Sequence, residues 1–97
     1  MTTYVTLYNF TDQGLRNIKD TLKRAKAVKQ AASQAGLTIK EILWLEGQYD
    51  ILVISESSDD VAAAAFSLNT LSQGNLRGQT LRAFTAADME KILEKAG

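Results

Sequence analysis

The chain has 97 residues, which suits one domain with its own hydrophobic core and is too short for two, so we expect residues 1 to 97 to form a single domain. Hydrophobic residues make up 45% of the chain and charged residues 23%, values that are ordinary for a globular protein and that exclude a disordered or membrane-spanning chain. The 11 basic and 11 acidic residues cancel, whereas a nucleic-acid-binding protein usually has a basic surplus, so no nucleic-acid partner is expected.

The N-terminal third predicts a strand followed by one long helix. Residues 3 to 10, TYVTLYNF, are rich in aromatic and β-branched types and alternate in character, which predicts a strand. Thr11 or Asp12 can cap the helix that follows. Apolar residues then recur every three or four positions from Leu15 to Ala35, which predicts a helix of about six turns that Gly36 ends.

The middle of the chain predicts a hairpin and a second helix. Residues 38 to 45 and 49 to 56 predict two strands joined by a turn that contains EGQ. Ser57 and Asp60 have the spacing of a capping box and predict a helix over about 59 to 72. The apolar residues that this helix is expected to present are Val61, Ala64, Ala65, Leu68 and Leu71.

The last segments complete a recognisable order of elements. Gly74 and Asn75 break the second helix, residues 76 to 84 predict a fourth strand, and Thr85 with Asp88 predicts a capping box for a short C-terminal helix. The order strand, helix, strand, strand, helix, strand is that of a split βαβ fold of the α+β class, with a four-stranded antiparallel sheet and two helices on one face.

Such a sheet has a second face that its own helices leave uncovered. The strand over residues 49 to 56 is apolar on both sides, with Ile51 and Val53 on one and Leu52 and Ile54 on the other. A solvated face would alternate with polar residues, and exposing four to six apolar side chains would forgo about 1.5 to 3 kcal/mol each. We therefore expect an identical sheet to cover the open face in a homodimer or larger homo-oligomer.

Three blocks of the chain resemble the GYD domain family. They are FTDQG with IKDT (residues 10 to 14 and 18 to 21), GQYD (47 to 50) and GNLRGQTLRAF (74 to 84). The resemblance covers nearly the whole chain and implies a small, mostly bacterial or archaeal protein with a ferredoxin-like fold of the dimeric α+β barrel type, without implying an activity. Relatives commonly have proline where this chain has Leu22, so the first helix is expected to be uninterrupted.

Asp50 is the foremost candidate for chemistry. An acid that opens an apolar strand can serve as a general acid or base, or it can hold a ligand. The alternatives are a structural hydrogen bond to the hairpin turn and an ion pair with Arg77 or Arg82. Trp44 and Tyr49, close by in the sequence, can flank a small-molecule pocket or belong to the core or an interface.

A second candidate is the start of the first helix. Thr11, Gln13 and the backbone N–H groups around Gly14 can form an anion cradle together with Lys19, or simply the capped start of a helix with an exposed basic face.

The absence of two residue types limits the metal sites and cofactors that this chain can be expected to have. The chain has no histidine and no cysteine, the commonest ligands of zinc and copper, so no metal is expected. It also has no P-loop and no nucleotide fingerprint, so no other cofactor is expected. The longest apolar runs are far shorter than the roughly 20 residues of a bilayer span, and the N-terminus lacks the pattern of a secretory signal. We therefore expect a cytoplasmic protein without a membrane partner.

These observations lead to one principal hypothesis and two alternatives. The principal one is a cytoplasmic homo-oligomer that binds a small molecule or a partner protein, in a pocket between the sheet and the first helix or at the subunit junction. The expected ligand-binding residues are Tyr8, Gln13, Lys19, Trp44, Tyr49, Asp50 and Arg82. One alternative is a cofactor-free isomerase, monooxygenase or decarboxylase of the dimeric α+β barrel type, in which Asp50 or a tyrosine moves the proton. The other is a structural assembly subunit.

Overall fold

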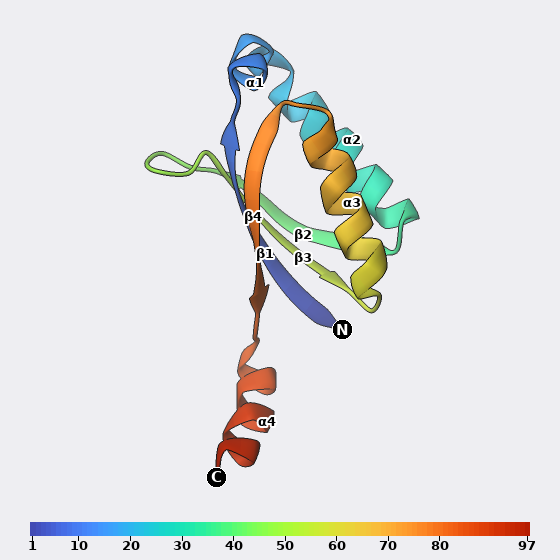
Figure 1. The fold of residues 1–97 in the computed structure, drawn as a ribbon, viewed down its shortest axis with the longest axis vertical. Coiled ribbons are helices and arrows are strands. Elements are labelled where there is room, and N and C mark those ends of the chain that lie inside the picture. The colour runs from blue at the N-terminus through green and yellow to red at the C-terminus, as the bar shows by residue number, and fades with distance from the viewer.

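The computed structural model describes all 97 residues and confirms the α+β, ferredoxin-like order of elements. The elements are β1 (Thr2–Phe10), α1 (Asp12–Arg16), the 3-10 turn η1 (Ile18–Asp20), α2 (Thr21–Gln34), β2 (Leu37–Trp44), β3 (Ile51–Ser57), α3 (Asp60–Ser72), β4 (Leu76–Ala83) and α4 (Ala86–Ala96). The strands form one antiparallel sheet in the order β2-β3-β1-β4. Helices α2 and α3 lie on one face of this sheet (Figure 1).

The first helix is interrupted, so the expectation of one continuous helix is wrong. Thr11 caps α1 as predicted, but α1 ends at Arg16 and α2 begins at Thr21 after the turn η1. The carbonyl oxygen of Asn17 accepts two hydrogen bonds at this break, from the Asp20 N–H at 3.0 Å and from Nη1 of Arg24 at 2.8 Å. The Arg24 side chain, on α2, is thereby tied to the C-cap residue of α1.

Helix α3 begins differently from the prediction. Asp59 is the N-cap, and its carboxylate accepts the backbone N–H groups two and three residues further on, at 3.0 and 3.1 Å. The Ser57 hydroxyl accepts the Asp59 N–H at 3.1 Å and donates to the carbonyl oxygen of Gly36 at 3.0 Å. The predicted capping box of Ser57 and Asp60 is therefore wrong, because Ser57 still belongs to β3 and uses its hydroxyl to hold two loops together.

The inner face of α3 also differs from the predicted one. Of the residues predicted to face inward, Leu71 packs against the buried core, whereas Val61 and Leu68 are 78% and 68% exposed. Ala63 and Phe66, which were not predicted, pack there instead. Apolar residues occur on every side of this helix, so hydrophobic periodicity alone defines its inner face poorly.

The buried core of the chain is small. Only 10 of the 97 residues are buried, and the apolar ones are Tyr8, Ala32, Leu37, Ile39, Ile51 and Val53, between the sheet and α2 and α3. Leu15 and Leu22, which the predicted periodicity placed with the core, are 55% and 70% exposed on either side of the break between α1 and α2. A core this small leaves space between the two layers.

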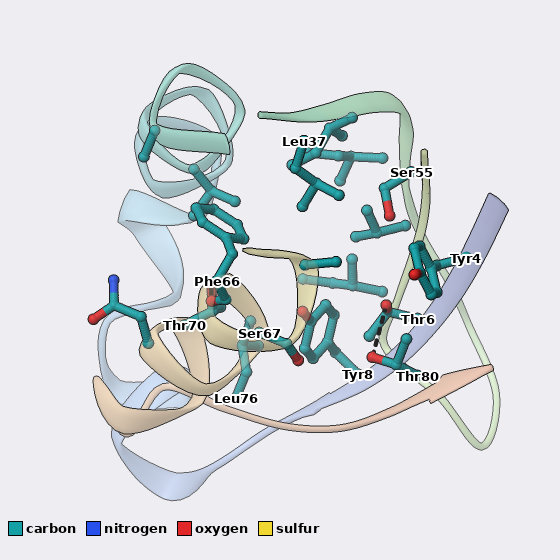
Figure 2. A pocket seen from close by; sticks show the side chains of 18 of the residues that line it. Tyr4, Thr6, Tyr8, Leu37, Ser55, Phe66, Ser67, Thr70, Leu76 and Thr80 are labelled. Carbon is teal, nitrogen blue, oxygen red and sulfur yellow. Dashed lines mark hydrogen bonds between the residues drawn. The ribbon is translucent and has the colours of Figure 1, made fainter. Parts of the chain in front are cut away.

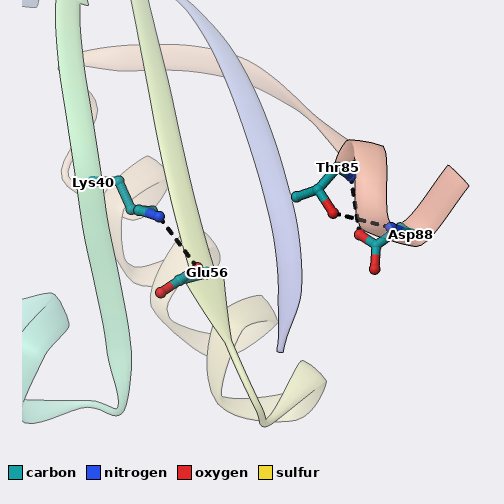
Figure 3. A network of polar contacts seen from close by, with 4 residues as sticks. All are labelled: Lys40, Glu56, Thr85 and Asp88. Atoms are coloured by element: carbon teal, nitrogen blue, oxygen red, sulfur yellow. Dashed lines mark hydrogen bonds and ion pairs between the residues drawn. The ribbon is translucent and has the colours of Figure 1, made fainter. Parts of the chain in front are cut away.

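The opposite face of the sheet is apolar and uncovered. Its apolar residues are neighbours across all four strands, and we call them the open-face cluster: Val5, Leu7, Leu43, Leu52, Ile54 and Leu81. At the margin of this face, Lys40 Nζ and a carboxylate oxygen of Glu56 lie 3.7 Å apart (Figure 3). Such partly exposed ion pairs add little to stability.

Helix α4 extends away from the sheet and the other helices (Figure 1). The predicted capping box at its start is confirmed. Asp88 N–H donates to the Thr85 hydroxyl at 3.1 Å, and Thr85 N–H donates to the Asp88 carboxylate at 3.0 Å (Figure 3). These bonds to Thr85 hold the pKa of Asp88 below its usual value. The stripe formed by Met89, Ile92 and Leu93 stays exposed. None of the helices combines the length and the apolar character needed to cross a membrane.

Candidate functional site

A cavity of about 820 Å³ lies between the inner face of the sheet and helices α2 and α3 (Figure 2). Small-molecule pockets commonly measure about 300 to 1,000 Å³, so this cavity has the size of a ligand site. Tyr8 and Val53 line it from the sheet, while Val28 of α2 and Phe66 of α3 line it from the helices.

Small side chains keep this space open. The lining residues with the smallest side chains come from both helices and from β3, and they include Ala25, Ala31, Ala63, Ala64 and Ser55. Larger side chains at these positions would bring more atoms into the gap between the layers. The cavity therefore follows from residue size at positions far apart in the sequence.

Polar residues of the sheet and of both helices line the cavity, and those of the sheet include four hydroxyl side chains that we call the hydroxyl cluster: Thr6, Tyr8, Ser55 and Thr80. The Oγ1 atoms of Thr6 and Thr80 lie 3.1 Å apart on neighbouring strands and share a hydrogen bond (Figure 2). Burial raises the pKa of Tyr8 above its ordinary value of 10.0, so its phenol is neutral at neutral pH. The cluster therefore offers uncharged donors and acceptors.

Charged lining residues occur at the edge strand β4 and on the helices. The Tyr4 hydroxyl donates to a carboxylate oxygen of Asp60 at 2.5 Å, and this bond raises the pKa of Tyr4. The Arg82 guanidinium stacks over the Phe84 ring at 4.5 Å and donates to the carbonyl oxygen of Ala83. No group of three metal-binding side chains is brought together.

The predicted ligand-binding residues fall into two groups. Tyr8 and Arg82 line the cavity, whereas the remaining ones do not: Gln13, Lys19, Trp44, Tyr49 and Asp50. Nε1 of Trp44 donates to the Thr21 hydroxyl at 3.1 Å and joins β2 to the start of α2. Lys19 is exposed in η1, and Tyr49 is half-buried in the hairpin loop.

Sequence reasoning missed Thr6, Ser55 and Thr80 as lining residues. Thr80 gave no local signal, because its neighbours on the inner side of β4 are Gly78 and Arg82. Thr6 and Ser55 did, since each is a small polar residue beside a larger apolar or aromatic one on the inner side of its strand. Such positions are ordinarily filled by larger apolar residues in a packed core.

Asp50 connects the hairpin to β1. Its carboxylate oxygen Oδ2 accepts the backbone N–H of Phe10 at 2.9 Å. Its own N–H donates to the carbonyl oxygen of Tyr8 at 2.8 Å, and its carbonyl oxygen accepts the Leu45 N–H at 2.7 Å. Neither arginine of β4 forms an ion pair with it. In this structure Asp50 thus satisfies backbone groups at the end of the sheet.

The start of α1 is bound by the turn between α3 and β4. The Thr11 hydroxyl donates to the carbonyl oxygen of Gly74 at 2.6 Å, and Thr11 N–H donates to that of Asn75 at 3.1 Å. Nε2 of Gln13 donates to the carbonyl oxygen of Gln73 and to Oδ1 of Asn75, both at 3.0 Å. The groups that were expected to cradle an anion are therefore engaged with the protein itself.

The three sequence blocks thus meet at one end of the sheet, where the block at residues 10 to 14 contacts both Asp50 and the turn at Gly74. The family model of the GYD domain matches residues 4–93. The chain belongs to the GYD domain family. Comparison with curated proteins and with solved structures found no match. In this GYD domain, Gly47 has a φ of +135°, a conformation that favours glycine, and Asp50 ties the hairpin that follows to β1.

Replacing Asp50 tests its structural role in the GYD domain. Asp50→Ala is expected to lower the free energy of unfolding by about 2 kcal/mol, because the part-buried Phe10 N–H loses its charged acceptor. Asp50→Asn keeps an acceptor oxygen and is expected to lose less than about 1 kcal/mol. Urea unfolding measures both, with Glu46→Ala in the same hairpin as an exposed control. Equal stability of all three variants would contradict the role.

Proposed function

We propose that this GYD domain is a cytoplasmic homo-oligomer that binds a small molecule in the cavity between its sheet and helices α2 and α3. The observation that carries the proposal is a cavity of about 820 Å³ in a chain with only 10 buried residues. The apolar walls of this open cavity face solvent, and a ligand that fills it would remove them from water and make contacts with them. Its mainly apolar lining with a few polar groups is typical of small-molecule sites.

Self-association is supported by the open-face cluster. Leu7 and Leu52 are direct cross-strand neighbours, as are Val5 and Ile54. These four side chains are already half-buried, so covering them contributes only part of the roughly 1.5 to 3 kcal/mol of a full burial, and a second copy offers an identical apolar sheet. Helix α4 adds an exposed apolar stripe directly after β4, the strand that carries Leu81 of the cluster. Two copies joined through these faces would cover both surfaces.

The enzyme alternative has less support from the geometry. Asp50 does not line the cavity, and its carboxylate is occupied by the Phe10 N–H. Tyr8 does line the cavity, but burial raises its pKa further above neutral pH, so the protonated phenol suits a hydrogen-bond donor better than a base. These two observations favour binding over proton transfer.

Native mass spectrometry of the protein purified gently from its own host tests the proposal. We expect a dimer or larger species that carries additional small-molecule mass, and the added mass should disappear under denaturing conditions. A monomer at micromolar concentration would contradict self-association. A clean oligomer without added mass, whose cavity also takes up no apolar probe, would instead favour the structural assembly subunit.

A further inference from the structure

Few charged side chains of the cavity are free to bind a ligand. Its charged lining residues are Arg24, Asp60 and Arg82. Asp60 accepts the Tyr4 hydroxyl at 2.5 Å, and Arg82 is stacked on Phe84 and bonded to the backbone. Both residues are themselves exposed, so they belong to the solvated edge of the cavity.

Arg24 is also unsuited to receive an anion as it stands. Its Nη1 donates to the Asn17 carbonyl oxygen at 2.8 Å. Its Nη2 has no hydrogen-bond partner, but this atom is enclosed by protein atoms, so a molecule in the cavity would reach it only after the side chain moved. A carboxylate held inside the cavity, away from the solvated edge, would thus lose its hydration without gaining a cation, which costs several kcal/mol.

The hydroxyl cluster, in contrast, can bind an uncharged oxygen; its Thr6 is buried on β1, and Thr80 is exposed on the edge strand β4 beside it. A hydroxyl group has one donor and two acceptor sites, and the bond between Thr6 and Thr80 uses only one of their two donors. One O–H of this pair is therefore left to donate, and the Tyr8 phenol, whose pKa burial raises and the Thr6 hydroxyl lowers, competes with a ligand for it. Ser55 and Tyr8 direct further hydroxyls towards the same space (Figure 2). An oxygen acceptor beside Thr6 and Thr80 would receive the remaining O–H hydrogen bond of these two residues.

We propose that the ligand is an uncharged, mainly apolar molecule with a carbonyl or hydroxyl oxygen, and that Thr6 and Thr80 hold this oxygen. The inference rests on the proposed small-molecule function and adds the chemical class of the ligand. The apolar body of the molecule would lie against Val53 of the sheet and Phe66 of α3.

Acetylnaphthalene and naphthoate form a matched pair of probes for this class. They share a ring system and a carbonyl group. Acetylnaphthalene has a methyl group on the carbonyl carbon, whereas naphthoate has an anionic oxygen there. In calorimetric titrations at neutral pH, we expect acetylnaphthalene to bind at least tenfold more tightly. Equal or tighter binding of naphthoate would overturn the uncharged class while leaving the small-molecule function in place. If neither probe binds, the proposed function fails together with the inference.

A double variant tests the position of the oxygen. Thr6→Val with Thr80→Val keeps the shape of both side chains and removes both hydroxyls, a change that is often nearly neutral for folding. We expect acetylnaphthalene to bind about tenfold more weakly and unsubstituted naphthalene to bind unchanged. Thr3→Val, on the opposite face of β1, is the matched control. Unchanged binding of the ketone by a folded double variant, with its melting temperature preserved, would overturn the assignment.

Discussion

Gly14→Ala is expected to lower the free energy of unfolding by about 3 kcal/mol, at the upper end of the usual cost of overpacking. A Cβ atom at this position would lie 2.2 Å from the carbonyl oxygen of Asn75, far inside any real contact distance. That oxygen is a backbone atom and also accepts the Thr11 N–H, so it cannot swing aside as a side chain would. Helix α1 would have to withdraw from the turn between α3 and β4.

Thermal unfolding measures this effect. For a domain of this size, each kcal/mol corresponds to about 4 to 8 °C, so the melting temperature should fall by more than about 10 °C. Arg16→Ala lies in the same short helix on an exposed side chain and should change stability by less than about 0.5 kcal/mol. A Gly14→Ala protein that melts like the unmodified one would show that α1 does not rest on this turn.

Ala63→Trp is expected to weaken ligand binding at least tenfold while leaving stability unchanged or higher. Ala63 lines the cavity on the inner side of α3 and packs beside the buried core, so an indole ring there would occupy part of the ligand's space. Filling a cavity commonly adds about 0.5 to 2 kcal/mol of stability. The two changes in opposite directions distinguish loss of a site from loss of the fold.

The matched control is Ala65→Trp, on the same helix. Ala65 is exposed and does not line the cavity, so the same substitution should leave binding unchanged. Fluorescence of the uncharged apolar dye Nile red, followed during titration with each variant, measures binding. Equal losses in both variants, or none in Ala63→Trp, would show that the dye binds elsewhere.

The elements that could be predicted were those with strong local signals. The four strands, the end of α2 at Gly36 and the capping box of Thr85 with Asp88 each depend on residues adjacent in the chain. The break between α1 and α2 could not be predicted, because Arg24 reaches back to Asn17 across it and the turn before β4 binds Thr11. Both contacts exist only in the folded chain.

The sequence by itself determined the order of elements, the α+β class, membership of the GYD domain family and a third strand that is apolar on both sides. The spacing of apolar residues and the residue types that form turns are local features, so they can be recognised along the chain. Only the tertiary structure decided that Asp50 holds the Phe10 N–H and that Thr6 and Thr80 share a hydrogen bond inside a cavity. The size of that cavity depends on how far side chains from distant segments hold two layers apart, which no local pattern records.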